Sequence, residues 1–168
     1  MLAARNGAGI AGLIKLRLEE RYFRPVQQSL CRNGFAEMAM CCLLIETMQC
    51  FRDGKNDTIK KGAGEKAYVD FFSWDQAPSG FVGSAKGFYK NVRCGILHQG
   101  ETKNGWTITR KNGLPLFDGK KQINAEKFSR ALNKSLAAYC RDLEQMAWND
   151  PLWDRCRDKM KFIVQNCR

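Results

Sequence analysis

Apolar residues recur along this chain at spacings of three and four, which place them on one side of an α-helix. The spacing predicts a first helix over residues 8–24, closed by Pro25. Its apolar positions are Ile10, Leu13, Ile14, Leu16 and Leu18. From Gly34 onward the segment "FAEMAMCCLLIETMQCF" is apolar on nearly every side, and this predicts the central buried helix of the fold.

Further helical patterns follow a polar, basic loop, "RDGKNDTIKKGAGEK". They are the short segment "AYVDFFSW", residues 85–99, a segment that begins after Asn124 and a last helix from Pro151. Residues 106–117 hold two extended runs around Asn112-Gly113, which predict a β-hairpin with Pro115 on its edge strand. Together the patterns predict an all-α bundle of about five helices with a minor hairpin, folded as one domain over residues 1–168.

Composition agrees with an ordinary globular domain, because 44% of the residues are hydrophobic and 27% are charged. No apolar run approaches the roughly 20 residues that cross a membrane. The first residues, "MLAARNGAGIAGLIKLRLEE", have only a brief apolar patch before charges begin, unlike a signal peptide. We therefore expect a cytoplasmic protein with no membrane partner.

The chain has eight cysteines, and none forms a C-x-x-C pair of the kind that holds structural zinc. They are Cys31, Cys41, Cys42, Cys50, Cys94, Cys140, Cys156 and Cys167. Cys41 and Cys42 lie inside the central apolar run, where free cysteine behaves as a small buried hydrophobe. We expect reduced thiols, no metal site and no cofactor.

The net charge of the chain gives more information about binding partners than the cysteines do. The chain has 28 Lys and Arg against 17 Asp and Glu, a formal net charge of +11. Such a surface attracts polyanions at long range and gains binding energy by releasing counterions from phosphates. A nucleic acid is the leading candidate, with an anionic membrane or an acidic partner protein as the alternatives.

A glycine pattern near the N-terminus matches the motif of dinucleotide-binding sites, but its context does not support such a site. Gly7, Gly9 and Gly12 spell G-x-G-x-x-G, but a dinucleotide site needs a preceding strand, and "MLAARN" is too short to supply one. About 20 residues later, where an acid should hold the ribose, stand Cys31 and Arg32. We interpret the pattern as the start of the first helix.

The segment "GFYKNVRCGILHQGETKNGW" carries the candidate chemistry. His98 is the only histidine of the chain, and histidine can give and take protons near neutral pH. Arg93, five residues earlier, is a permanent cation whose fork suits phosphate oxygens. RNA supplies its own nucleophile, the 2′-hydroxyl, so one imidazole and one guanidinium are a minimal set for cleaving it.

On an ideal helix Arg93 and His98 point about 140° apart and do not share a narrow face. The stripe that should face the bundle consists of Phe88, Val92, Gly95 and Ile96. Leu97 then lies on the opposite side, where a leucine is unusual. A second copy packed across a two-fold axis would cover Leu97 and bring two Arg/His pairs together. This predicts a homodimer with a shared site.

"VRCGILHQGE" resembles the signature of the HEPN superfamily (higher eukaryote and prokaryote nucleotide-binding domains). In that signature a histidine follows an arginine after four to six residues, late in a helical bundle. Arg93 and His98, with four residues between them, match the shortest spacing. The resemblance implies a helical homodimer and a metal-independent endoribonuclease with Arg93 and His98 as its catalytic pair. It also implies a role as a toxin or in antiviral defence, with an antitoxin or another defence protein as candidate partner.

The chain departs from the family pattern at two positions. Cys94 stands where members often have Asn, Asp or His beside the arginine, so that polar neighbour is missing. Gly100 stands where toxins silenced by adenylylation have a tyrosine, so a nucleotidyltransferase antitoxin is not supported. Cys94 and His98 are one turn apart and offer a thiol–imidazole dyad as an alternative, although no orienting third residue is visible.

Glu46 is the second candidate of the site. It lies in the middle of the central apolar run, where an unpaired carboxylate is costly, so we expect it to pair with Arg93 or with another cation. Around the motif, RNA could contact phosphate-binding cations and one stacking aromatic ring. These candidates are Lys90, Lys103, Arg110 and Trp106.

The sequence therefore predicts a homodimeric, metal-independent endoribonuclease. His98 would act as general base or acid, Arg93 would stabilise the charge on phosphorus-bound oxygens, and Glu46 and Cys94 would support them. The alternative is a non-catalytic helical module that binds nucleic acid or a partner protein through its basic surface.

Overall fold

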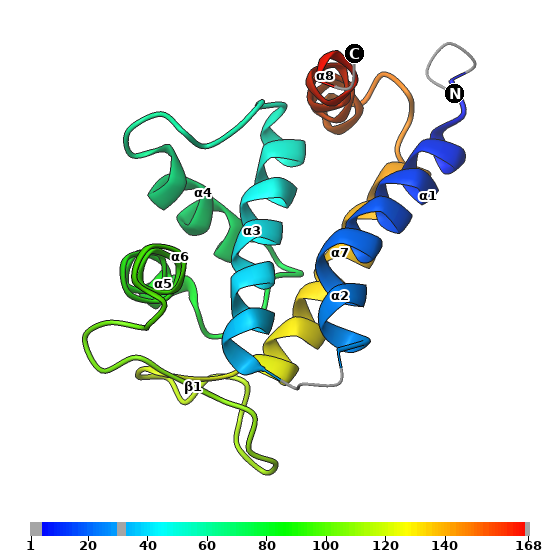
Figure 1. The fold of residues 1–168 in the computed structure, drawn as a ribbon. Coiled ribbons are helices and arrows are strands. Elements are labelled where there is room, and N and C mark those ends of the chain that lie inside the picture. The colour runs from blue at the N-terminus through cyan, green and yellow to red at the C-terminus, as the bar shows by residue number, and fades with distance from the viewer. Residues whose placement is uncertain (1–4, 30–32, 167–168) are drawn as a thin grey trace.

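A computed structural model describes residues 5–29 and 33–166 of the chain as a bundle of helices with one small sheet (Figure 1). The helices are α1 (Gly7–Leu18), α2 (Arg24–Gln27), α3 (Gly34–Asp53), α4 (Ala63–Phe72), α5 (Ala85–Phe88), α6 (Cys94–Gln99), α7 (Ala125–Gln145) and α8 (Pro151–Gln165). The strands are β1 (Thr107–Thr109) and β2 (Gln122–Asn124). The predicted all-α character is confirmed.

Helix α3 is the centre of the bundle and packs against α4, α7 and α8. The Asn33 side chain caps its start by accepting hydrogen bonds from the Phe35 and Ala36 amides, and Gly54 ends it in the left-handed conformation, at φ 70°. By length and hydropathy α3 resembles a membrane span more closely than the sequence suggested, with mean hydropathy 1.3 over its most apolar window. However, 61% of that window is buried inside the bundle, as in a core helix.

The first helical segment continues past Pro25, where we predicted it to end. A π-helical turn at Glu19–Phe23 follows α1 and leads directly into α2. The Arg24 amide donates to Glu19 O, five residues back, which widens the helix just before the proline. Because Pro25 has no amide hydrogen and its ring crowds the previous turn, the wider turn lets the helix continue.

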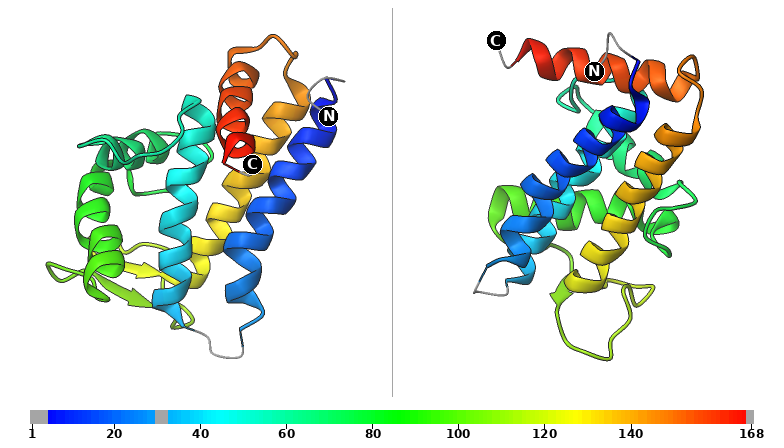
Figure 2. Two further views of the ribbon diagram at one scale, coloured as in Figure 1. Left: turned by 45° about the horizontal axis from the view of Figure 1, so that its top comes forward. Right: turned by 90° about the vertical axis from the view of Figure 1, so that its right-hand side faces the viewer.

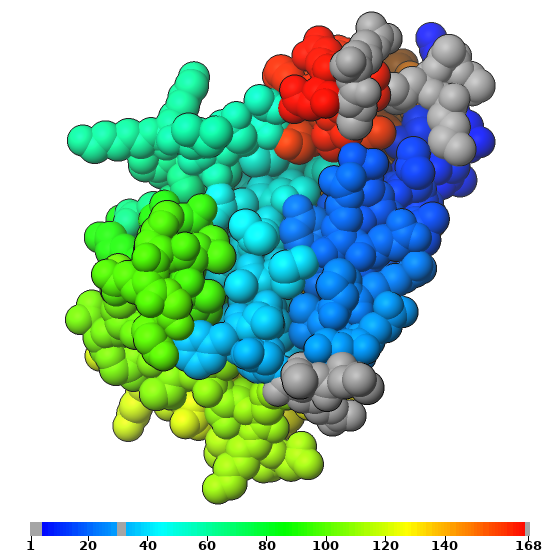
Figure 3. Space-filling model, in the orientation of Figure 1, coloured from blue at the N-terminus to red at the C-terminus, as the bar shows by residue number. Residues whose placement is uncertain are grey.

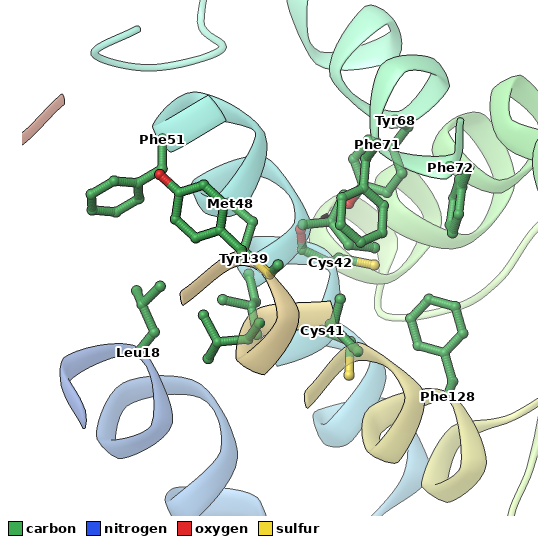
Figure 4. Close-up of a cluster of buried hydrophobic side chains, with 14 of the residues drawn as sticks. Leu18, Cys41, Cys42, Met48, Phe51, Tyr68, Phe71, Phe72, Phe128 and Tyr139 are labelled. Carbon is green, nitrogen blue, oxygen red and sulfur yellow. Dashed lines mark hydrogen bonds between the residues drawn. The ribbon is translucent and has the colours of Figure 1, made fainter. Parts of the chain in front are cut away.

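The core is one contiguous apolar cluster (Figure 4). Figure 4 shows Cys41 and Cys42 of α3 between the aromatic side chains of α4 and Phe128 of α7. Both thiols are buried, as predicted, and burial raises the pKa of Cys42 to about 12. Cys31 and Cys167 lie outside the described residues.

Helices α1 and α7 run side by side, and α8 crosses one end of the bundle (Figure 2). Ile10, Ile14 and Leu18 of α1 face the core, as predicted. Leu13 and Leu16, which we also counted among the apolar positions of this helix, are 42% and 44% exposed. Helix α1 therefore has a second apolar side that the bundle leaves uncovered.

The predicted β-hairpin over 106–117 is wrong. Strand β1 pairs with β2 in parallel, with Thr107 opposite Gln122. Asn112-Gly113 is a turn, but the runs on its two sides do not pair with each other. The tight reversal lies at Asp118, whose Oδ1 accepts the amides of Lys120, Lys121 and Gln122, and it brings Phe117 opposite Ile123.

Candidate active site at the motif helix

The motif occupies one continuous helical segment over residues 85–99, as predicted. It is made of α5, a π-helical turn at Tyr89–Arg93, and α6. The Cys94 amide bonds to Tyr89 O, five residues back. Such single π turns are frequent at functional sites. Here the turn ends at the arginine of the motif.

The buried side of this segment is the one that the sequence indicated. Phe88 and Val92 are fully buried, Gly95 is buried, and Ile96 is half-buried. A Cβ at Gly95 would collide with the carbonyl oxygen of Glu101, because the chain folds back over the helix after the left-handed Gly100. Gly95 thus permits the close return of the loop that follows His98.

Glu46 of α3 pairs with Arg93, which is the partner we expected for it. Arg93 Nε donates to Glu46 Oε1 at 2.7 Å, and the two side chains are 19% and 13% exposed. Burial lowers the pKa of Arg93, but the hydrogen bond and the charge of Glu46 outweigh it, so the pKa is raised overall. The guanidinium is therefore held in place as a permanent cation.

The same guanidinium contacts the histidine of the motif. Arg93 Nη1 lies 3.2 Å from His98 Nε2, although the two residues diverge by about 140° on the helix. The long arginine side chain spans that angle. A guanidinium can only donate, so His98 Nε2 is the acceptor of this hydrogen bond. His98 is exposed, while Leu97 beside it is half-buried.

Two residues that the sequence reasoning missed complete the cluster. Thr58, in the loop between α3 and α4, donates a hydrogen bond to Glu46 Oε2. The ring of Tyr89 lies under the guanidinium, 5.5 Å from Arg93 Cζ, and Tyr89 packs against Gly64 of α4. A tyrosine four residues before an arginine on a helix is a signal for this stacking. No pattern in the sequence brings Thr58 to Glu46.

Cys94 lies beside Tyr89 of the cluster. Burial raises the pKa of Tyr89, and the neighbouring Cys94 thiol adds to that rise. Cys94 is half-buried, and His98 Nε2 is occupied by Arg93. Among the described residues, the structure gives His98 a hydrogen bond with Arg93 and none with Cys94, so the geometry favours the Arg/His pair.

The four predicted RNA contacts do not come together. Lys90 is exposed on the motif helix, with its Nζ 3.5 Å from Glu65 of α4, and Lys103 follows the helix in the returning loop. Trp106 is only 6% exposed and stacks on Phe117 with ring centroids 5.9 Å apart, so it cannot stack on a base. Arg110 pairs with Glu37 at the start of α3, away from the motif.

Other predicted features are simpler to place. Gly7, Gly9 and Gly12 lie in α1, so the G-x-G-x-x-G pattern is part of a helix, and Cys31 and Arg32 fall outside the described ranges. Within residues 5–29 and 33–166, the structure has no group of three or more His, Cys, Asp or Glu side chains suited to a metal ion.

Comparisons with protein-family models, with curated proteins and with solved structures found no match to this chain. Functional assignment therefore depends on the chemistry of the Thr58–Glu46–Arg93–His98 cluster.

Proposed function

We propose that this protein is a metal-independent endoribonuclease of the HEPN type, with Arg93 and His98 as its catalytic residues. The observation that carries the proposal is the contact of Arg93 Nη1 with His98 Nε2 while Glu46 holds Arg93 Nε. This arrangement places a fixed cation and an exposed proton acceptor side by side. Attack of the RNA 2′-hydroxyl on the neighbouring phosphorus requires these two groups, a base that takes the hydroxyl proton and a cation that stabilises the phosphate oxygens.

The reaction proceeds in one displacement at phosphorus. His98 Nε2 accepts the proton of the 2′-hydroxyl while O2′ bonds to phosphorus. The bond from phosphorus to O5′ breaks, and O5′ takes up a proton from an acid on the opposite side. Arg93 stays bonded to Glu46 through Nε, and its Nη groups donate to the non-bridging oxygens in place of His98 and stabilise their charge. The products are a 2′,3′-cyclic phosphate and a 5′-hydroxyl.

A second protomer supplies the opposite side in this proposal. One chain has only one histidine, and a single imidazole cannot be base and acid at once on the two sides of one phosphorus. A two-fold axis beside α6 brings a second Arg93 and His98 to the same phosphodiester. The half-buried Leu97 next to His98 fits such a contact.

The basic surface supports RNA as the substrate. Lys86, Lys90 and Arg93 follow one another at about one turn along the motif helix. Lys86 and Lys90 share one carboxylate, Glu65, at 3.9 and 3.5 Å, and remain mostly exposed. Two cations against one acid leave net positive charge beside the catalytic pair, where the RNA backbone would lie. Toxin or defence activity is the biological role proposed with this chemistry.

The direct test is incubation of a 5′-labelled RNA of about 30 nucleotides with the purified protein in EDTA. Wild-type protein is expected to release fragments with cyclic phosphate ends, and His98→Ala should be slower by about 100-fold or more. Equal binding of RNA by both proteins is the control for folding. Cleavage that needs an added divalent ion, or that survives His98→Ala, would overturn the mechanism.

The dimer is tested separately by light scattering on the wild-type protein and by the activity of single variants. Arg93→Ala and His98→Ala are each expected to be inactive, because each would place two defective halves at the shared site. Efficient cleavage by a protein that stays monomeric would overturn the shared site. Tight, salt-sensitive RNA binding without any cleavage would instead favour the binding module.

A further inference from the structure

A separate cleft lies between α1, the π turn that follows it, α3 and α8. Its volume is about 170 Å³. The floor is apolar and is formed by Ile14, Leu18, Phe51, Met160 and Ile163. Figure 3 shows α1, α3 and α8 meeting on the face of the molecule that it presents.

The size of this cleft limits what it can hold. Pockets for cofactors and drug-sized ligands usually measure about 300–1,000 Å³. A cleft of about 170 Å³ instead suits one large apolar side chain, such as leucine or phenylalanine. An anchor residue from another polypeptide fits it better than a complete nucleotide does.

Several apolar side chains near the cleft are exposed to solvent and do not contribute to the core. Leu13, at its edge, is 42% exposed, and Leu16, one turn along α1, is 44% exposed. Val164, next to the cleft residue Ile163 on α8, is 41% exposed. Exposed leucines grouped beside an open apolar cleft mark an interaction surface more often than single ones do.

The rim of the cleft is positively charged. Arg17, Arg21 and Lys159 line it together with the apolar floor. In the part of the chain that the structure describes, Arg17 and Arg21 have no carboxylate within ion-pair distance, whereas Arg24, one turn after Arg21, pairs with Glu20 at 3.0 Å. Lys159 Nζ donates to the carbonyl oxygen of Asn56 and has no acidic partner there either. Three cations are thus left for an external anion.

We propose that this surface binds an acidic peptide segment of a partner protein, with one bulky apolar side chain in the cleft. Its Asp or Glu residues would pair with Arg17, Arg21 and Lys159. A second copy of this chain fits less well, because a two-fold axis would set these cations against their own copies. RNA gains little from an apolar floor of this kind. The site is separate from the Arg93–His98 pair and is occupied whether or not the protein cleaves RNA.

The probe is a phage-displayed library of random 12-residue peptides, selected on the full-length wild-type protein. Peptides that also bind the double variant Leu13→Glu/Arg21→Glu are removed first. The best remaining peptide is synthesised with a fluorescent label and titrated by anisotropy. Both substituted side chains are exposed, so the fold should persist, and circular dichroism checks that it does.

Enriched peptides are expected to combine Asp or Glu with one Leu, Phe or Trp. Leu13→Glu and Arg21→Glu should each weaken binding about tenfold or more, while Lys120→Glu, a matched charge reversal in the exposed loop before β2, should change it less than about twofold. No enrichment, basic peptides, or equal loss with Lys120→Glu would overturn the proposal. A wild-type dimer that Leu13→Glu dissociates, without peptide binding, would assign the surface to a second copy instead.

Discussion

Helix α3 carries two glutamates, and each holds an arginine from a distant part of the chain. Glu46 holds Arg93 on the motif helix, and Glu37 holds Arg110 just after β1. The glutamates are nine residues apart, two and a half helical turns, so they leave α3 on opposite sides. Both pairs lie mostly within the protein, yet only one has the features of a reactive site.

The difference lies in what surrounds each arginine. Arg110 is enclosed by acids, since Glu126 is 3.5 Å away in addition to Glu37, and Arg130 closes the network on Glu126. Arg93 pairs with one carboxylate, Glu46, through Nε, and its Nη1 contacts His98. A buried Arg–Glu pair therefore shows only that an arginine is held. Whether such an arginine can act on a substrate depends on two further features: N–H donors that no carboxylate occupies and a proton acceptor beside them.

The same substitution in both pairs separates the two roles most strongly. Arg93→Lys is expected to lower RNA cleavage by about 100-fold or more, because an ammonium cannot bond Glu46 and a phosphate as a fork does. Arg110→Lys should leave cleavage within about threefold and lower the free energy of unfolding by about 1 kcal/mol. Cleavage rates in EDTA and urea unfolding measure the two effects. Equal loss of cleavage in both variants would contradict this separation.

The glutamates are expected to differ in the same direction but by less. Glu46→Gln keeps an oxygen for Arg93 Nε but removes the charge, so cleavage should fall about tenfold through loss of arginine alignment. Glu37→Gln is the matched control and should cleave as fast as wild type. RNA affinity, measured in the same samples, should be unchanged in both. A Glu46→Gln protein with full activity would show that Glu46 is only structural.

Much of this comparison could be predicted from the sequence, because local patterns determine helices strongly. The central helix, the motif segment over 85–99 and the Asn124-capped helix α7 follow from apolar spacing and caps. Glu46 could be paired with Arg93 in advance because a carboxylate among apolar residues needs a cation, and Arg93 already stood in the candidate site.

The failures come from contacts between segments far apart in the chain. From the sequence alone, Arg110 is interpreted as a surface cation. In the fold it pairs with Glu37, which lies 73 residues earlier in the chain. The parallel pairing of β1 with β2 also depends on tertiary packing, and Asp118-Gly119 was the turn signal that the hairpin prediction overlooked. Trp106 became core because Phe117 folds over it, which no local pattern shows.

Thr58 offers a smaller test of how firmly Glu46 is held. Its hydroxyl donates to Glu46 Oε2, on the side of the carboxylate away from Arg93. Thr58→Val keeps the shape and removes that donor, so cleavage should fall about threefold, whereas Thr58→Ser should restore it. The pH dependence of cleavage, recorded for all three proteins, distinguishes alignment from a fold defect, which the serine variant would not rescue. No difference between valine and serine would remove Thr58 from the site.

The smallest expected effect is a pH dependence of stability at the enclosed pair. Burial raises the pKa of Glu37 above its ordinary value near 4.5, and Glu126 adds to the rise, while Arg110, Ser129 and Arg130 oppose it. The folded protein therefore holds the Glu37 proton more tightly than the unfolded chain does. This contribution to stability is complete below about pH 4.5 and is lost as the pH rises through the folded pKa. Glu37→Gln lacks the titration, so the free energy of unfolding of wild type minus that of Glu37→Gln should decrease between about pH 4 and pH 7, measured by urea unfolding. An increase over that range would mean that Arg110 outweighs burial, and the two arginine–glutamate pairs would then be electrostatically alike.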